Sequence, residues 1–349
     1  MAKMKTYLWA LFLIPSIGIY SQSIEETLSY LSSDAATEYS QPAVTAFGSN
    51  MSSGWFTGLP PTSTVGFHAR LRFVGVGSLF TDDVRRFSTT GQFQYTSQQA
   101  NDILIASGLD PSFIPNYDEI RNELLNQVWD VRIEGPTITG SANEFVTVEF
   151  PGTTIQGVTI NPYVVEMTDV KGFLNNSDML PTPALQLDLS GFIGTGVSVR
   201  YFSGVNISNL GKMNVWGAGF VHNINYWFED PIPIDIGFGY YFQRFDIGDS
   251  FKNTASQLGL YISKSIGTIV SIVPYMGLTY ESSKSKLDYD YRFDTPTGPQ
   301  EINLSIDYEG ENLVGLTVGA TIIFPVISLN FDYKVAQSQT GTIGIGFGF

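Results

Sequence analysis

The chain ends in Thr342-Ile343-Gly344-Ile345-Gly346-Phe347-Gly348-Phe349, and this stretch decides the fold. Its isoleucines and phenylalanines share one parity, and a threonine and three glycines occupy the other. Because alternate side chains of a strand face opposite sides of the sheet, one face is large and apolar and the other is nearly bare. Such a last strand is typical of a transmembrane β-barrel, whose lipid-facing band is flanked by aromatic residues. The alternative is an edge strand of a secreted β-sandwich.

This ending resembles the carboxy-terminal signal of bacterial outer-membrane barrels, in which a terminal phenylalanine follows alternating apolar residues and is read by the assembly machinery. The resemblance implies that Phe347 and Phe349 form an assembly signal. It also implies two partners, the barrel-assembly machinery and outer-membrane lipid.

The amino-terminus has the layout of a secretory signal peptide. Lys3 and Lys5 precede an apolar run over residues 7–19, and the small Ser21 follows. We therefore predict a signal peptide over residues 1–22. No other run of about 20 apolar residues occurs, so an embedded chain has to be a closed barrel, because lipid offers no hydrogen-bond partners to the backbone.

Composition agrees with a barrel and excludes several functions. The chain has 349 residues, of which 43% are hydrophobic and only 15% charged, and it contains no cysteine. Disulfides, thiol chemistry and cysteine metal sites are therefore excluded. Removing residues 1–22 takes away two lysines, leaving 16 basic against 33 acidic residues, a net charge of −17. Such an acidic surface argues against nucleic acid as a partner.

Apolar alternation separated by turns recurs along the chain, most regularly after residue 184. We predict an all-β antiparallel transmembrane barrel of 14 strands, or 12 if residues 128–170 hold one hairpin fewer, because both ends must lie at the periplasmic rim. The predicted strands start near Thr64, Arg85, Val128, Asn143, Thr154, Ala184, Gly196, Lys212, Ile232, Ala255, Thr268, Gly310, Ile327 and Thr340.

Two stretches depart from the strand pattern. Residues 23–62 begin with a predicted helix over Ser23–Ser33 and continue as a small, polar stretch without strand character, for which a periplasmic tail is one interpretation. Residues 97–127 predict a small helical insert on the periplasmic side or in the lumen. The expected organisation is therefore a signal peptide (1–22), an N-terminal segment that starts with a helix (23–62) and a barrel (63–349).

Two segments carry a resemblance to a known family. They are residues 180–184 leading into 196–202, and residues 215–224. Both resemble blocks of an uncharacterised family of outer-membrane barrels from Bacteroidetes-type bacteria, loosely similar to the fatty-acid-transporter-like barrels. In that larger group an amino-terminal segment plugs the lumen, so the resemblance implies a plug over residues 23–62. The group's Asn-Pro-Ala opening is absent here, which argues against a fatty-acid cargo.

Charged residues at inward parity are the candidate lumen lining. In the first strand, His68, Arg70 and Arg72 alternate with apolar residues, and an arginine facing lipid at the midplane would cost about 2–4 kcal/mol. Arg200 and the acids Asp188, Asp235 and Asp332 take the same parity on other strands. Two interpretations follow. The cations pair with the wall or the plug and are structural, or they face an open lumen and form a constriction that favours anions.

Residues 281–311 predict a hairpin that projects from the membrane. Its acids are weak candidates for calcium binding, with a solvated acidic face as the alternative: Asp288, Asp290, Asp294, Asp307 and Glu309. His222 has no serine partner in a Gly-x-Ser-x-Gly motif, so we expect a rim histidine rather than an enzyme. No cofactor is expected.

These observations favour a channel or transporter for a small hydrophobic or amphipathic solute. The alternative is a surface adhesin or secretion-assembly component that acts through the 281–311 hairpin.

Overall fold

The computed structural model describes residues 33–62, 66–168, 170–172, 174–175, 177–207, 211–230, 232–295 and 298–348. Within these residues ten antiparallel strands form a closed barrel, each paired with the next along the chain and the last with the first. They are β1 (His68–Leu79), β8 (Met179–Phe192), β9 (Thr195–Ile207), β10 (Gly211–Asn223), β11 (Asp235–Ile247), β12 (Phe251–Ser263), β14 (Ser271–Thr295), β16 (Val314–Ile323), β17 (Ile327–Val335) and β18 (Thr340–Gly348). The predicted counts of 14 and 12 strands are therefore wrong.

The parity predicted from the sequence separates the two faces of the wall. On β1, Leu71 and Phe73 are exposed on the outer face, while Arg72 and Val74 are buried inside. Large apolar side chains are exposed in the same way on the other nine strands. A closed barrel of even strand number with an apolar outer band has the architecture of an outer-membrane barrel. Among the described helices, none has both the length and the apolarity needed to span a membrane.

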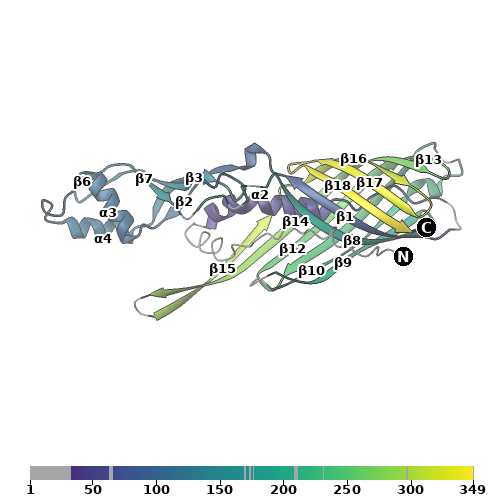
Figure 1. The fold of residues 1–349 in the computed structure, drawn as a ribbon. Coiled ribbons are helices and arrows are strands. Elements are labelled where there is room, and N and C mark those ends of the chain that lie inside the picture. The colour runs from purple at the N-terminus through teal and green to yellow at the C-terminus, as the bar shows by residue number, and fades with distance from the viewer. Residues whose placement is uncertain are drawn as a thin grey trace, which may run out of the picture.

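Connections differ between the two rims. At the carboxy-terminal rim, β8 and β9 are joined by Ile193 and Gly194, both with positive φ (46° and 67°), as a tight hairpin turn requires. Two longer connections at this rim contain η3 (Ile224–Trp227) and β13 (Ile266–Gly267). Much larger structures rise from the opposite rim (Figure 1). This asymmetry agrees with the short inner turns and long outer loops of outer-membrane barrels.

Residues 80–178 form an additional unit between β1 and β8, called the outer unit here. It contains a four-stranded sheet in the order β2-β3-β4-β7 and a separate β5-β6 pair. Its elements are η1 (Asp82–Val84), β2 (Arg86–Phe93), α3 (Ser97–Ala106), α4 (Tyr117–Asn126), β3 (Trp129–Pro136), β4 (Val146–Phe150), β5 (Thr153–Ile155), β6 (Val158–Ile160) and β7 (Tyr163–Met167).

The outer unit corrects two predictions. The strands expected near Arg85, Val128, Asn143 and Thr154 belong to it and not to the barrel wall. Its strands have three to eight residues, too few for the roughly nine to eleven that a spanning strand needs. The helices expected over residues 97–127 are present, but they lie beyond the rim opposite the carboxy-terminus (Figure 1), not in the lumen or at the carboxy-terminal rim.

A hairpin also projects from this opposite rim. β14 continues past the barrel, and β15 (Gly298–Glu309) pairs with its extension from Lys284 to Thr295 (Figure 1). It occupies the stretch for which the sequence predicts a hairpin.

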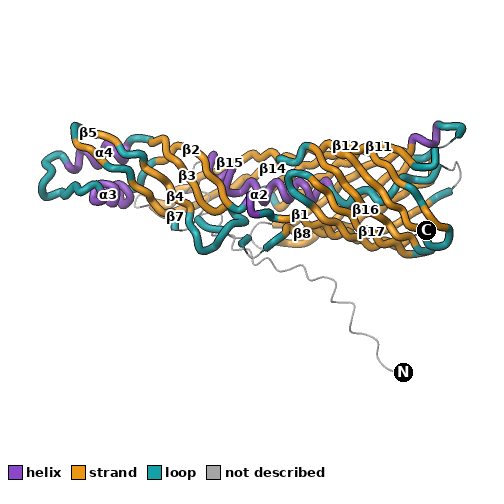
Figure 2. The backbone as a smooth tube through the Cα atoms, turned by 90° about the horizontal axis from the view of Figure 1, so that it is seen from above, coloured by secondary structure: helices purple, strands orange, loops and turns teal. Residues whose placement is uncertain are grey.

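The helix α2 (Ser33–Ser52) runs from the outer unit into the barrel (Figures 1 and 2). The predicted helix over Ser23–Ser33 lies outside the described residues except for its last residue. The sequence does not predict α2, because small residues dominate it and Pro42, a residue that disfavours helix, stands inside it. After Ser52 the chain continues without regular structure to residue 62 and then reaches β1 at the carboxy-terminal rim. We call residues 33–62 the lumen segment.

Candidate functional site in the barrel lumen

The lumen segment contacts inward-facing residues of all ten wall strands. Its backbone carbonyls, hydroxyls and aromatic rings form a hydrogen bond or a ring contact with at least one residue of each strand. These wall residues include Arg72 (β1), Gln186 (β8), Arg200 (β9), Asn223 (β10), Tyr241 (β11), Tyr261 (β12), Tyr275 (β14), Thr321 (β16), Lys334 (β17) and Thr340 (β18). A segment in contact with every strand of a closed ring lies inside that ring.

Two arginines bind the backbone of the lumen segment. Arg72 is 1% exposed, and its Nη2 donates to the carbonyl of Trp55 at 2.8 Å while its Nε donates to Asp188 at 2.5 Å. Arg200 is also 1% exposed, and its Nη2 donates to the carbonyl of Ser53 at 2.9 Å. The carboxylate of Asp188 accepts further hydrogen bonds from Gln186 and Ser198. Arg72 is thus paired with a carboxylate, whereas Arg200 donates to the amide oxygens of Gln186 and Gln243 as well as to Ser53. Gln186 joins Arg200 to the Asp188 network, and these bonds offset the cost of burying the charges.

A second buried ion pair lies nearer the opposite rim. Lys334 Nζ lies 2.8 Å from Glu281 Oε2, and both side chains are 2% exposed. The same ammonium donates to the carbonyl of Ser49 at 3.2 Å. Beside it, the hydroxyls of Ser49 and Thr340 are 2.7 Å apart. Charged and hydroxyl groups of the wall therefore hold the end of α2.

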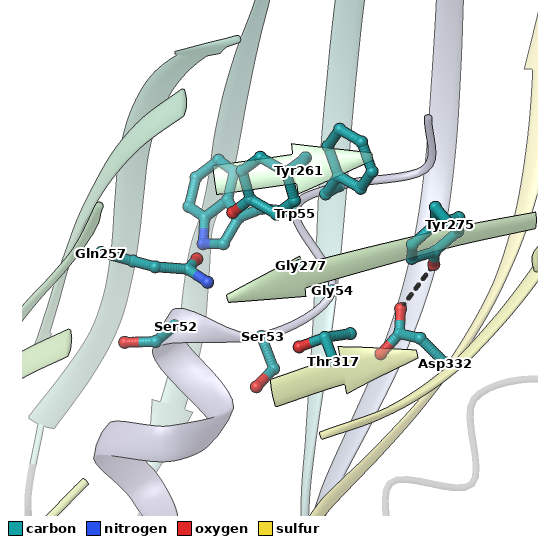
Figure 3. Close-up of a pocket in the computed structure, with 11 residues that line it drawn as sticks. Ser52, Ser53, Gly54, Trp55, Gln257, Tyr261, Tyr275, Gly277, Thr317 and Asp332 are labelled. Carbon is teal, nitrogen blue, oxygen red and sulfur yellow. Dashed lines mark hydrogen bonds between the residues drawn. The ribbon is translucent and has the colours of Figure 1, made fainter. Parts of the chain in front are cut away.

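Aromatic rings fill the middle of the lumen (Figure 3). Trp55 stacks on Tyr241 with ring centroids 5.1 Å apart, and the guanidinium carbon of Arg200 lies 3.9 Å from the Trp55 ring centroid. Phe56 stacks on Tyr261 at 4.1 Å and meets Tyr275 edge-on at 5.1 Å. The cavity left between these rings and the wall has a volume of about 20 Å³, room for about one water molecule.

Glycines on the inner face make room for these rings. A Cβ built on Gly217 would lie 2.9 Å from the Trp55 ring, and one on Gly237 would collide with Leu59. Larger side chains at these positions would compete with the lumen segment for the same space. Gly237 and Gly239 are buried on the inner face, and the glycines at 344, 346 and 348 form the nearly bare inner face that the terminal sequence predicts.

The structure places the predicted lumen residues in different environments. Arg72, Asp188 and Arg200 come together in one network, as described above. Asp332 accepts a hydrogen bond from the Tyr275 hydroxyl at 2.9 Å, and Asp235 accepts one from Asn223 at 2.8 Å. Arg70 is half-buried beside Arg72, whereas His68 is exposed at the carboxy-terminal rim. These seven residues thus form separate contacts rather than one lining.

Several lumen residues were not predicted from the sequence. Trp55 and Phe56 lie in a stretch without strand or helix periodicity, so only the resemblance to plugged barrels pointed to them. Tyr241, Tyr261 and Lys334 do stand at inward parity on predicted strands. An inward aromatic or lysine on a barrel strand is the signal that could have identified them.

The remaining candidate residues lie outside the lumen. Asp288 accepts hydrogen bonds from Lys286 and Ser305. The bond from Lys286, followed by that from Ser305, lowers the pKa of the Asp288 carboxyl below its ordinary value. The side chains of Asp290 and Asp294 lie outside the described residues, as does Phe349. The described residues, among them Asp307 and Glu309, contain no group of three or more potential metal ligands. Phe347 is exposed on the outer face.

His222 lies in an aromatic rim cluster. Its Nδ1 is 2.9 Å from the Thr195 hydroxyl, and its Nε2 accepts from the Trp227 indole at 2.7 Å. One ring nitrogen thus contacts the wall strand β9, and the other contacts η3 in the connection between β10 and β11. This placement agrees with a rim histidine beside an aromatic girdle.

A family model described as a family of unknown function (DUF6588) matches residues 1–349. The chain belongs to this family. No curated protein matches it. Among solved structures, the β-domain of the Bordetella autotransporter BrkA is 11% identical with a TM-score of 0.29, covering 80% of this chain and 100% of that one.

Two other solved structures resemble the chain at a similar level. The Ralstonia pickettii toluene transporter TbuX is 11% identical with a TM-score of 0.21, covering 90% of this chain and 93% of that chain. The N-terminal barrel domain of Pseudomonas aeruginosa OprF is 11% identical with a TM-score of 0.20, covering 44% and 94%. These similarities concern the fold and say nothing about what this chain binds.

Proposed function

We propose that this protein is a gated outer-membrane channel for a small hydrophobic or amphipathic solute, and that its lumen segment is the plug. The observation that carries this proposal is that a separate segment, and not the wall side chains, fills most of the lumen. Glycines and short polar side chains line much of the inner wall, and a separate stretch of chain fills the space they leave. Small barrels of about eight strands are filled by their own wall side chains, whereas the lumen of this ten-stranded barrel is filled by a separate segment.

The polar contacts between plug and wall favour a plug that can move. Arg72, Arg200 and Thr321 bind backbone carbonyls of residues 53–57, and water can replace such partners when the segment leaves. In the closed state the burial of Arg72 favours the structural interpretation of this cationic patch over a constriction exposed to permeating anions.

We place the carboxy-terminal rim in the periplasm, following the short connections of that rim and the expected assembly signal. The outer unit and the β14–β15 hairpin then lie outside the cell. Acidic residues outnumber basic ones by 14 to 5 over residues 81–178, which suits a surface where cations bridge carboxylates.

A reversible lock on the plug tests the proposal. The chain has no cysteine, so Ser49→Cys with Thr340→Cys places a single disulfide where two hydroxyls are 2.7 Å apart. We expect planar-bilayer conductance to be present under reducing conditions and abolished by oxidation, because the bond ties the plug to β18.

The matched control links the wall to itself. Ser78→Cys with Thr340→Cys joins β1 to β18, where the hydroxyls are 2.8 Å apart, and leaves the plug free. Its conductance should not respond to oxidation. Equal conductance of the oxidised and reduced plug-locked variant, with the disulfide verified by gel mobility, contradicts a movable plug.

The outer unit favours a second function, a surface adhesin or secretion-assembly component. It has a buried apolar core that includes Ile133, Val148 and Phe150, each fully buried, and the hairpin projects beside it. The barrel would then be its anchor. Absence of conductance even from the reduced plug-locked variant would favour this function over the channel.

A further inference from the structure

Three inward tyrosines lie flat against glycines of the wall. A Cβ on Gly277 would lie 2.6 Å from the Tyr261 ring, one on Gly319 would lie 2.6 Å from Tyr275, and one on Gly219 would overlap Tyr241. The glycines therefore allow the rings to lie along the wall instead of crossing the lumen. Together Tyr241, Tyr261 and Tyr275 form a concave aromatic surface, called the tyrosine bed here.

Trp55 and Phe56 occupy the tyrosine bed as a ligand would. Trp55 is 3% exposed and lies against both the Tyr241 ring and the Arg200 guanidinium, while Phe56 lies parallel to Tyr261. Stacking and cation–π contacts both select planar π systems over saturated groups of the same size. The wall thus has the recognition chemistry of an aromatic site, and the plug supplies the aromatic groups.

Polar atoms without partners lie beside the rings. The hydroxyl oxygens of Ser52 and Tyr261 and the amide oxygen of Gln257 are buried and have no hydrogen-bond partner among the described residues. All three residues line the cavity of about 20 Å³ next to Trp55 and Phe56 (Figure 3). Tyr261 can donate and Gln257 Oε1 can accept, so one hydroxyl or amine group on an aromatic ring would match them.

We propose that the tyrosine bed is a binding site for small planar aromatic solutes that carry one polar group, either a substituent or a ring N–H, and that Trp55 and Phe56 fill it in the closed state. This proposal rests on the gated channel and names its solute class. A solute that takes the bed competes with the plug for the same surface, and its binding therefore favours release of the plug.

The test uses the full-length protein with Trp55→Ala and indole as the probe. Indole should raise the unfolding midpoint of this variant by a few degrees, measured as heat-modifiable gel mobility, because it binds the folded form alone. Cyclohexanol, which lacks a π face, should raise it much less. Adding Tyr241→Leu should weaken indole binding roughly tenfold, through loss of the stacking partner.

Trp216→Ala is the matched control, since Trp216 is 47% exposed on the outer face and its removal opens no space in the lumen. Equal responses of folded Trp55→Ala to indole and cyclohexanol, or no response to either, overturn the proposal. If Trp55→Ala does not fold, Phe56→Ala with phenol gives the same two readings.

The indole experiment tests the aromatic site and the conductance experiment tests the channel, so failure of one proposal can be told from failure of the other. Oxidation-sensitive conductance without preference for aromatic probes keeps the channel and removes the aromatic site. Selective indole binding without conductance keeps the site and removes the channel.

Discussion

At the scale of single residues, the buried cations of the lumen show what a sequence can predict. Parity placed Arg72, Asp188 and Arg200 on the inner face, because the opposite parity would put charge in lipid. Parity did not predict that the arginines bind the carbonyls of Ser53 and Trp55. Backbone carbonyls are the same at every position, so partners of this kind leave no sequence signal.

Arg72 should therefore contribute strongly to stability. Arg72→Ala removes the partner of Asp188 and the donor to Trp55. Breaking a fully buried pair costs about 3–5 kcal/mol, and we expect the low end of that range because Asp188 is 23% exposed. Arg244→Ala is the comparison, since Arg244 pairs with Asp246 while 44% exposed, and such surface pairs contribute about 0–1 kcal/mol. Urea unfolding followed by gel mobility measures both, and equal losses would mean that the lumen network does not stabilise the barrel.

At the scale of elements, strand length separates correct predictions from wrong ones. Apolar alternation shows that one face of a strand is buried, but not whether lipid or a helix covers it. β11 and β12, with 13 residues each, run from rim to rim in the barrel wall as predicted, whereas β4, with five residues, packs in the outer unit. The helix α2 was missed because its small side chains, suited to a narrow lumen, produce little amphipathic contrast.

The helix α2 also connects the lumen to the outer unit. Tyr39 is fully buried in the core of that unit, which raises the pKa of its phenol; its hydroxyl donates to the Lys171 carbonyl at 2.8 Å, and its carbonyl accepts from the Ile138 amide. Tyr39→Ala should speed tryptic cleavage within residues 80–178 and leave the barrel resistant. Glu38→Ala, at an exposed position of the same helix, should cleave as the wild type does. Unchanged cleavage of Tyr39→Ala would show that the outer unit is stable without α2.

At the scale of the whole molecule, the path of the chain joins both rims through the lumen. The start of α2 packs in the outer unit, and residues 47–51 contact the wall nearer the rim opposite the carboxy-terminus. The Pro60 carbonyl then accepts a hydrogen bond from Asn223 near the carboxy-terminal rim. β1 then rises from that rim. Anything bound by the outer unit acts on the same helix that carries the plug, so one element links surface contacts to the state of the lumen.

This path predicts which parts of the chain face the outside. Asp34 is exposed at the start of α2, and Asp230 is exposed in the connection between β10 and β11 at the carboxy-terminal rim. In the natural chain, which has no cysteine, Asp34→Cys and Asp230→Cys are unique labelling sites. A maleimide attached to a polyethylene glycol too large for the outer membrane should modify Asp34→Cys in intact cells and Asp230→Cys only after lysis. The reverse pattern would place the outer unit in the periplasm, where a surface partner cannot reach it and a solute would have to meet the plug from inside.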